Sequence, residues 1–409
     1  MTGRRVAALG LALALLVAAC ADDDATAPTA APPTAPTTAP TTAPTSTFVP
    51  EDGPSEPADP LPAGRPGDLV SVTARRSADV PPGARAWDVL YRSTGVAGTP
   101  VAVSGVVLVP SGPAPPGGRR VLSWAHGITG VADACAPSRS GLQIPYLDDF
   151  LAAGFAVAAT DYEGLGTPGV HPYLVGASEG RSVLDAARAA HNLEEAAAGR
   201  EVVVLGHSQG GHAALFAGEM AEDYAPDLRL AGVVAGAPVG ELTQLMGAAS
   251  RIGFGAGLLA LLVSGYAAAY PDLDPADVFT PAGSALLAGV DEACLTEVTV
   301  SFLSSPLPRL VRSSPLDVPA WARRLRENEP GSRPVRAPVL VVQGAADLVV
   351  PAATTDVTVE RLCQVGTSVD YRRYDGADHT SVLRPAEADV LAFVTGRLAG
   401  ATSRPGCPA

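Results

Sequence analysis

Short apolar runs recur along the chain from residue 68 onward. Three of them, bounded by turns that contain Pro or Gly, predict an opening antiparallel meander at 69–74, 86–91 and 101–109. Six more alternate with segments of helical spacing, at 121–124, 156–160, 202–205, 230–235, 339–343 and 369–374. Continuous apolar strands between helices are typical of a parallel sheet that is buried on both faces. The pattern therefore predicts an α/β domain over 68–409, with a mostly parallel sheet flanked by helices.

The alternation of strands and helices breaks down between Pro238 and Pro334. This stretch contains a seven-residue apolar run at 257–263 and then tyrosines and prolines, which predicts a helical insertion. The apolar run has two interpretations: a buried helix segment, or a lid that forms one wall of a binding site.

The N-terminus has the features of an export signal. Arg4 and Arg5 precede an apolar run at 6–17 that is too short to span a bilayer, which predicts a signal peptide over 1–19. The four residues that end at Cys20 resemble a bacterial lipobox, in which the cysteine is lipidated and becomes the new N-terminus. The alternative is ordinary cleavage, because small residues flank Cys20 on both sides. The first interpretation predicts a surface lipoprotein anchored to a bacterial membrane, and the second a secreted protein.

Residues 20–67 are dominated by Ala, Thr and Pro. Such a tract buries too little apolar surface to fold and is expected to be an extended, disordered tether. After a lipid anchor it would hold the domain away from the membrane. A dispensable leader would have the same conformation, so the two interpretations differ only in whether Cys20 carries lipid.

The charge balance excludes several classes of function. The chain has 42 acidic and 28 basic residues, and every basic residue is arginine. An acidic chain without a basic run repels phosphate backbones, which argues against nucleic-acid binding. The missing lysine excludes Ser-Lys dyads, Schiff bases and a P-loop. Nothing in the sequence indicates an obligate protein partner.

The chain has five cysteines, and lipid on Cys20 leaves Cys135, Cys294, Cys363 and Cys407. Four cysteines allow three pairings, between which the spacing does not choose. An exported chain meets an oxidising compartment, which favours two disulfides over free thiols. No Cys-x-x-Cys or His-x-x-x-His spacing indicates a metal site, and no metal or cofactor is expected.

The clearest chemical motif follows the apolar run at 202–205, where the chain reads Gly206-His207-Ser208-Gln209-Gly210. This is Gly-x-Ser-x-Gly between a strand and a helix, the nucleophile elbow of the α/β-hydrolase fold. The elbow is so tight that a Cβ at either outer glycine would collide with neighbouring backbone. Ser208 would then stand at a helix N-terminus, where the dipole favours developing negative charge. The alternative is a Gly-rich turn with an incidental serine.

A serine nucleophile needs a base and an acid that orients the base. Of the six histidines, His379 follows the last predicted strand and precedes a C-terminal helix, which is where this fold places its base. The alternative for His379 is a histidine of a surface loop without a catalytic role. Asp347 comes just after the apolar run at 339–343, a position that suits the acid that orients the base. Asp375 and Asp378 are too close to His379 to hold it from the opposite side, and are predicted to form a turn.

Two main-chain N–H groups would hold an oxyanion beside Ser208. Gln209 would supply one of them. The other would come from the loop that follows the run at 121–124, where Ile128, Thr129 and Gly130 are candidates, and we choose Thr129.

Several segments together resemble the secreted, yeast lipase A-like family of the α/β-hydrolase superfamily. They are the elbow, the stretches 161–166, 173–176, 179–185 and 133–138, and the loop at 344–351 together with His379. The resemblance covers roughly residues 70–407 and implies carboxylic ester hydrolysis, with an ester or lipid as substrate. It also implies that Ser208, Asp347 and His379 form a triad.

The resemblance implies further features that the pattern alone does not. It places a helical cap after the sixth core strand, which matches the insertion at 238–334. If the run at 257–263 is a lid, it would form a wall of the binding site for the acyl chain. It suggests the disulfides Cys135–Cys294 and Cys363–Cys407. The lipobox and the Thr/Pro tether are not part of the yeast pattern, and they concern anchoring rather than the site.

Two other functions stay open from the sequence. One is a serine peptidase of the same fold, similar to a prolyl aminopeptidase. The other is a non-catalytic surface binding module, against which the intact Ser, Asp and His argue because a dead hydrolase commonly loses one of them.

Overall fold

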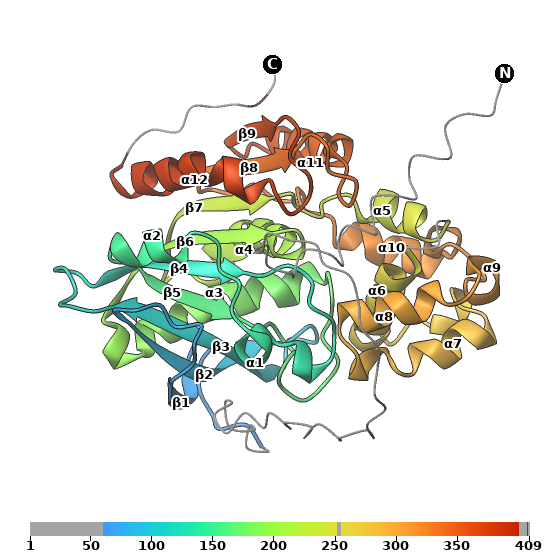
Figure 1. The fold of residues 1–409 in the computed structure, drawn as a ribbon, viewed down its shortest axis with the longest axis horizontal. Helices are drawn as coiled ribbons and strands as arrows, with labels where there is room; N and C mark the ends of the chain where they lie inside the picture. Colours follow the sequence, from blue (N-terminus) through green and yellow to red (C-terminus); the bar gives the residue numbers. More distant parts are fainter. Residues whose placement is uncertain (1–59, 252–254, 401–406, 408–409) are drawn as a thin grey trace, which may run out of the picture. The chain divides into compact units, whose positions relative to one another are not determined.

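The computed structural model describes residues 60–251, 255–400 and 407. The predicted signal peptide, Cys20 and most of the tether lie outside this part of the chain. The described residues form one nine-stranded sheet (Figure 1). Its strands are β1 (Leu69–Arg75), β2 (Ala84–Thr94), β3 (Pro100–Pro110), β4 (Arg119–Ala125), β5 (Ala156–Thr160), β6 (Ala198–His207), β7 (Arg229–Gly236), β8 (Val339–Gly344) and β9 (Val369–Tyr374).

The strand order is β1-β2-β3-β5-β4-β6-β7-β8-β9. β1, β2 and β3 pair antiparallel, β3 pairs antiparallel with β5, and all strands from β5 to β9 across the sheet pair parallel. The predicted meander, the six later strands and the mostly parallel sheet are therefore confirmed. Each of the nine apolar runs that predict a strand lies within a strand of the sheet.

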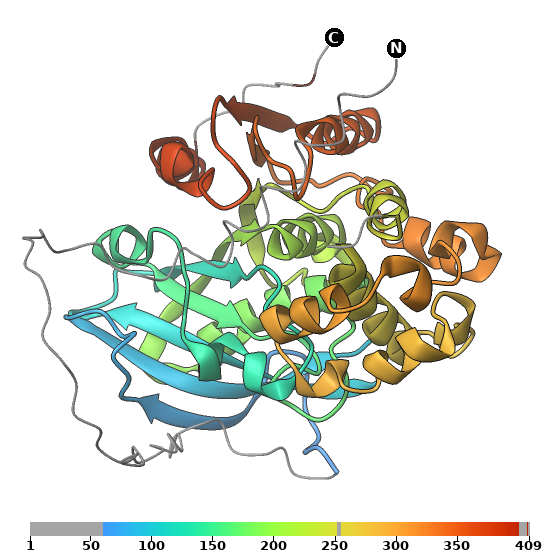
Figure 2. The ribbon, with the colours of Figure 1, turned by 45° about the vertical axis from the view of Figure 1, so that its right-hand side comes forward.

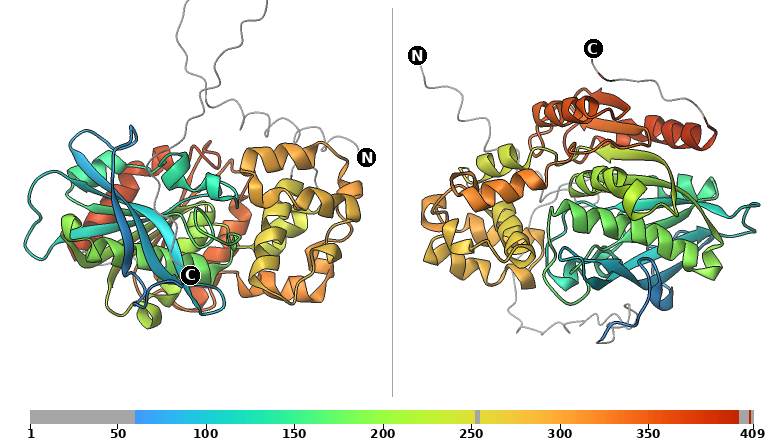
Figure 3. Two further views of the ribbon diagram at one scale, coloured as in Figure 1. Left: turned by 90° about the horizontal axis from the view of Figure 1, so that it is seen from below. Right: turned by 180° about the vertical axis from the view of Figure 1, so that it is seen from behind.

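The parallel strands are buried on both faces because consecutive side chains of a strand point to opposite sides. In β6, Val202 and Val204 pack in one apolar cluster, whereas Val203 and Leu205 pack in another. The first cluster lies under α3 (Gly176–Asn192), α4 (Gln209–Tyr224) and α11 (Ala352–Gln364), and the second under α2 (Leu147–Ala152) and α12 (Leu383–Leu398). Figure 3 shows α3 and α4 side by side across the face seen from behind.

The segment between β7 and β8 is helical, as the broken alternation predicts. Figures 1 and 2 show its yellow and orange helices gathered beside the sheet as a cap. They are α5 (Leu242–Ala249), α6 (Gly255–Ala269), α7 (Pro281–Leu287), α8 (Leu295–Leu303), α9 (Leu307–Leu310) and α10 (Pro319–Glu327).

The cap has an apolar core of its own, which also takes in loops of the sheet domain. Tyr173, Leu174 and Val175 join it from the segment before α3, Val239 from the segment after β7, and Val350 from the loop after β8. Each of these residues follows the carboxyl end of a parallel strand. The cap therefore covers the edge of the sheet at which α/β folds place their ligands.

Two disulfides join distant parts of the chain, and both match the pairs that the family resemblance suggests. Cys135, which precedes α1 (Pro137–Ser140), is bonded to Cys294 at the start of α8, and Cys363 in α11 is bonded to Cys407. The first bond ties the segment after β4 to the cap. Within the described part of the chain, no helix is both long and apolar enough to cross a membrane.

Candidate active site

Ser208 lies in the turn between β6 and α4. β6 ends at His207, Ser208 has φ 59° and ψ −118°, and α4 begins at Gln209. A positive φ is uncommon for a residue other than glycine, and backbone strain of this kind clusters at functional sites. The neighbouring strand holds the turn in place, because the Ser208 N–H donates to the carbonyl oxygen of Gly236 over 2.8 Å.

The two outer glycines of the elbow have no room for a side chain. A Cβ at Gly206 would collide with the carbonyl oxygen of Gly210, and a Cβ at Gly210 would collide with that of Ala125 in β4. Both contacts are with backbone, which cannot rotate away. The glycines therefore let the elbow fold tightly against the end of β4.

His379 reaches Ser208 from the loop between β9 and α12. Its Nε2 lies 2.9 Å from the Oγ of Ser208, and its Nδ1 lies 2.8 Å from an oxygen of Asp347. An ionised carboxylate only accepts hydrogen bonds, so Nδ1 carries the ring proton and Nε2 is free to accept the serine O–H. The backbone of the loop is held as well, because Nε2 of His207 donates to the carbonyl oxygen of His379 over 2.7 Å.

Asp347 is buried in the loop after β8, with 4% of its surface exposed. One carboxylate oxygen accepts the N–H groups of Val349 and Val350, each over 2.8 Å. The other accepts from His379 and from Nε2 of Gln343 over 3.1 Å. Four donors thus fix the orientation of a carboxylate that faces one imidazole.

Gln343 was not singled out in the sequence. It ends the apolar run of β8, and its Nε2 also lies 3.0 Å from the carbonyl oxygen of Val350, while its Oε1 accepts from Thr355. The side chain therefore holds both Asp347 and the loop that follows it. A polar residue at the end of an otherwise apolar buried strand was the available signal.

Within the described residues, the ring of His379 has no hydrogen bond to Asp375 or Asp378, the two other aspartates near it in the sequence. One oxygen of Asp378 accepts from the N–H and hydroxyl of Ser381 and from the N–H of Thr380. These bonds, led by that of the Ser381 hydroxyl, lower the pKa of Asp378. Asp378 forms the turn that carries His379, in the way the sequence predicts.

The loop after β4 lies against the elbow. A Cβ at Gly127 would lie 3.6 Å from the Cβ of Ser208 and 3.4 Å from the carbonyl oxygen of His207. Further along the loop, the carbonyl oxygen of Thr129 accepts the N–H of Leu295 at the start of α8 over 2.9 Å. The loop is thus held between the elbow and the cap, and Thr129 stays our choice for the second oxyanion donor.

Three further histidines, His126, His171 and His212, are buried in the sheet domain. The ring of His126 lies 4.5 Å from that of Tyr162, which stacks in turn on His171 at 5.5 Å. Burial lowers the pKa of His171 to about 4, so the ring is neutral. His212 and Glu179 are fully buried and in contact.

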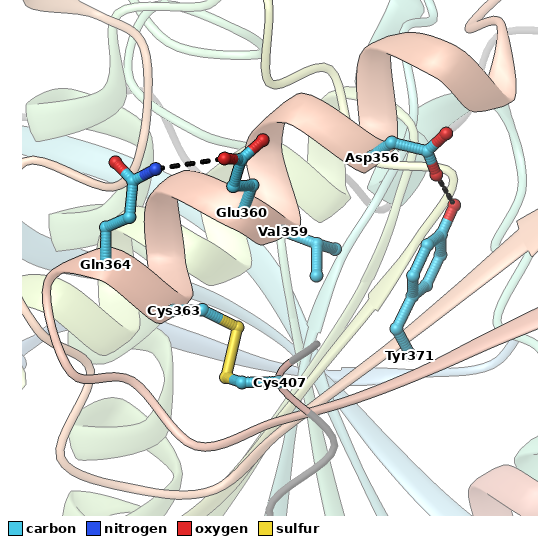
Figure 4. Close-up of a pocket in the computed structure, with 7 residues that line it drawn as sticks. All are labelled: Asp356, Val359, Glu360, Cys363, Gln364, Tyr371 and Cys407. Carbon is cyan, nitrogen blue, oxygen red and sulfur yellow. Dashed lines mark hydrogen bonds between the residues drawn. A yellow bond between two sulfur atoms is a disulfide. The ribbon is translucent and has the colours of Figure 1, made fainter. Parts of the chain in front are cut away.

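Among residues 60–251, 255–400 and 407, no three His, Cys, Asp or Glu side chains are grouped so that they could hold a metal ion. A cavity of about 690 Å³ lies elsewhere, between α11, β9 and Cys407 (Figure 4). Its lining includes Asp356, Glu360, Tyr371 and the Cys363–Cys407 disulfide. Ser208, Asp347 and His379 do not line it.

Comparison with known proteins gives the family. A family model described as secretory lipase matches residues 138–406. The chain is 29% identical over 364 residues to a protein named probable inactive lipase from Mycobacterium tuberculosis, a match that covers 81% of this chain and 79% of that one. It is 26% identical to a secreted triacylglycerol lipase of Malassezia globosa, with 86% and 80% covered.

Solved structures share the fold. Candida antarctica lipase A in its closed state matches with a TM-score of 0.72 and 22% identity, over 84% of each chain. A ligand-bound form of the rice cell wall degrading esterase LipA from Xanthomonas oryzae matches with a TM-score of 0.67 and 21% identity, over 82% of this chain and 98% of that one. Since the secretory lipase model covers well over half of its residues, the chain belongs to the secretory lipase family of carboxylic ester hydrolases.

Proposed function

We propose that the protein is an exported serine esterase or lipase in which Ser208 is the nucleophile, His379 the general base and Asp347 the acid that orients the base. The observation that carries this proposal is the continuous chain of hydrogen bonds from the Ser208 hydroxyl through both nitrogens of His379 to Asp347. A nucleophile, a base within 3 Å and a third group on the far side of the base are what acyl transfer from serine requires.

The reaction has two halves. Oγ of Ser208 attacks the ester carbonyl carbon while Nε2 of His379 takes the hydroxyl proton, and the N–H groups of Gln209 and Thr129 hold the oxyanion. The C–O bond to the alcohol breaks, and the alcohol leaves with the proton from His379. Water then attacks the acyl-enzyme, His379 takes a proton from the water, and the carboxylic acid leaves as the Ser208 Oγ regains that proton.

Apolar side chains on both sides of the elbow support an ester with an acyl chain as substrate. Ile128 stands next to Gly127 in the oxyanion loop, and Val349 stands two residues after Asp347; both pack, partly buried, against the apolar core of the cap. Each CH₂ of an acyl chain that leaves water there contributes about 0.8 kcal/mol. The excess of acidic residues, in contrast, disfavours anionic polymers as substrates.

The same proposal extends to the N-terminal residues. Residues 1–19 are a signal peptide, Cys20 carries lipid, and 20–67 tether a catalytic domain at 68–409 to the cell surface. Two disulfides and membership of the secretory lipase family support an exported location. Cleavage without lipidation would give a secreted enzyme with the same site.

A non-catalytic role is the second candidate, and it is favoured by the similarity to the Mycobacterium tuberculosis protein named probable inactive lipase. The experiment that separates the possibilities is turnover of p-nitrophenyl butyrate and p-nitrophenyl palmitate beside proline p-nitroanilide, with fluorophosphonate labelling of the same protein. Ester turnover with labelling at Ser208 is the expected result. Preference for the anilide would make the protein a peptidase, and neither turnover nor labelling would make it a binding module.

A further inference from the structure

A buried glutamate behind the elbow has no part in the triad. Glu179 lies in the first turn of α3, and its side chain is fully buried. One oxygen accepts the N–H of Leu174 over 2.9 Å and Nε2 of Gln209 over 2.8 Å. The other lies 2.8 Å from Nδ1 of His212, in the first turn of α4.

The hydrogen bonds settle which way the Gln209 amide points. Its nitrogen lies 2.8 Å from Nε2 of His171 as well as from Glu179, whereas its oxygen has no partner. Nδ1 of His171 faces the carbonyl oxygen of Glu163 over 2.8 Å and must donate to it. Nε2 of this neutral ring is therefore an acceptor, and the two N–H bonds of the amide satisfy His171 and Glu179 together.

The ring of His212 faces acceptors on both sides. Its Nδ1 faces Glu179, and its Nε2 lies 2.9 Å from the carbonyl oxygen of Asn328 at the end of α10. A carbonyl oxygen only accepts, so Nε2 carries a proton. Burial raises the pKa of Glu179, but the hydrogen bonds from His212 and Gln209 outweigh it, so the pKa is lowered from its usual value. A carboxylate at this position accepts the N–H groups of Leu174 and Gln209.

These contacts close a ring through three elements. Glu179 joins α3 to α4, His212 joins α4 to Asn328, and the side-chain oxygen of Asn328 accepts the N–H of Gly176 at the start of α3 over 2.9 Å. The amide of Asn328 also donates to the hydroxyl of Tyr270 in the cap. The first turn of α4 is thereby held by α3 on one side and by the cap on the other.

We propose that Glu179, which contacts both Gln209 and His212, is a positioning residue for ester hydrolysis that holds Gln209, and with it the Gln209 main-chain N–H, beside Ser208. The inference rests on the proposed function. Ser208 keeps a strained backbone, and the next residue must stay in place while charge develops on the substrate oxygen. A charged acceptor holds the Gln209 side chain more firmly than a neutral one would.

The test compares two substitutions of the same kind on p-nitrophenyl butyrate. Glu179→Gln removes the charge but keeps the shape, and kcat should fall by ~10-fold to 100-fold, short of the ~100-fold or greater loss of a whole oxyanion donor. KM should change far less than kcat, because the ground-state ester does not use the oxyanion site fully. The second-order rate of fluorophosphonate labelling at Ser208 should fall in parallel.

The matched control is Glu219→Gln. Glu219, like Glu179, is a buried glutamate, and it lies in α4 two turns beyond His212. Its carboxylate accepts hydrogen bonds from the main-chain N–H of Gly331 and the hydroxyl of Ser332. Its substitution should lower the melting temperature and leave kcat within about twofold of the unaltered protein. Equal losses of kcat in both variants, or an unchanged kcat in Glu179→Gln, would overturn the positioning role.

A second variant separates this inference from the proposed function on which it rests. An active Ser208→Ala protein would remove the proposed function, whereas an inactive one beside an unaffected Glu179→Gln would reject this inference alone.

Discussion

Nε2 of His379 lies 2.9 Å from Oγ of Ser208, although 171 residues separate the two along the chain. The contact depends on the order of the strands. Ser208 directly follows β6, and His379 follows β9 at the edge of the parallel sheet, with β7 and β8 between these two strands. The loop after β9 therefore has to reach back across two strands, and the bond from His207 to the His379 carbonyl oxygen holds it there.

Ser208→Ala should abolish ester hydrolysis and leave the fold intact. The substitution removes the only atom that forms the acyl-enzyme, so the loss should be on the order of 10⁴-fold or more in kcat. Fluorophosphonate labelling should disappear with the activity. Labelling that persists at another serine would assign the nucleophile elsewhere.

Asp347→Asn should lower kcat by up to ~10⁴-fold, because an amide that donates to His379 selects the wrong tautomer of the ring. The loss should appear in kcat more than in KM, since Asp347 does not contact the ester. Kinetics of the purified variant, beside a thermal melt, measure it.

Asp378→Asn is the matched control, and Asp375→Asn is a second. Asp378 holds the turn at Thr380 and Ser381, so its loss should cost stability and only a small part of kcat. If either control cripples the enzyme while Asp347→Asn does not, the acid has been misassigned.

The stability contributed by His207 should depend on pH. Burial, followed by the charge of His379, lowers its pKa from 6.5 to about 4. Between these values the unfolded chain binds a proton that the folded protein does not, so the folded state loses stability as the pH falls from 6.5 to 4. His207→Gln keeps a donor for the His379 carbonyl but does not titrate.

Urea unfolding of both proteins at several pH values checks this expectation. The difference in the free energy of unfolding, unaltered protein minus His207→Gln, should fall by at most about 3 kcal/mol between pH 6.5 and 4, since each pKa unit is worth about 1.4 kcal/mol and the ring is partly exposed. A difference that stays constant with pH would show that His207 is not held neutral.

Leu259→Asp and Leu262→Asp should damage the fold and not the acyl-chain preference. Both leucines are fully buried in α6, inside the apolar core of the cap. A carboxylate there has to be desolvated without a partner. The melting temperature should therefore fall, together with kcat/KM for butyrate and palmitate esters alike.

A selective loss on palmitate at an unchanged melting temperature would instead identify the 257–263 run as an acyl-chain wall. Leu258, the one residue of this run that is partly exposed, offers a matched comparison. Leu258→Asp should lower the melting temperature less than Leu259→Asp or Leu262→Asp does.

Cys20→Ala should release the protein from membranes, because the acyl groups on Cys20 would be its main anchor. Fractionation of an exporting bacterium, with mass spectrometry of the mature N-terminus, measures the effect. A soluble, unacylated protein before the substitution would contradict the lipoprotein assignment and leave the catalytic proposal untouched.

The local sequence was enough to predict the strands and the helical insertion of this protein and to select the residues of its candidate site. The strands are apolar runs because they are buried on both faces, and the elbow is readable because Gly206 and Gly210 leave no room for a Cβ. His379 and Asp347 could be selected because this fold places its base and acid after particular strands.

Tertiary structure alone decided how those residues are held. Gln343 supports Asp347, and Glu179 with His212 supports Gln209, through side chains whose partners lie on other strands and helices. No local pattern reports such contacts, because a hydrogen bond between distant segments leaves no period in the sequence. The same reason applies to 257–263: its apolar residues fit a lid or a core equally well, and only the packing of the cap around α6 buries them.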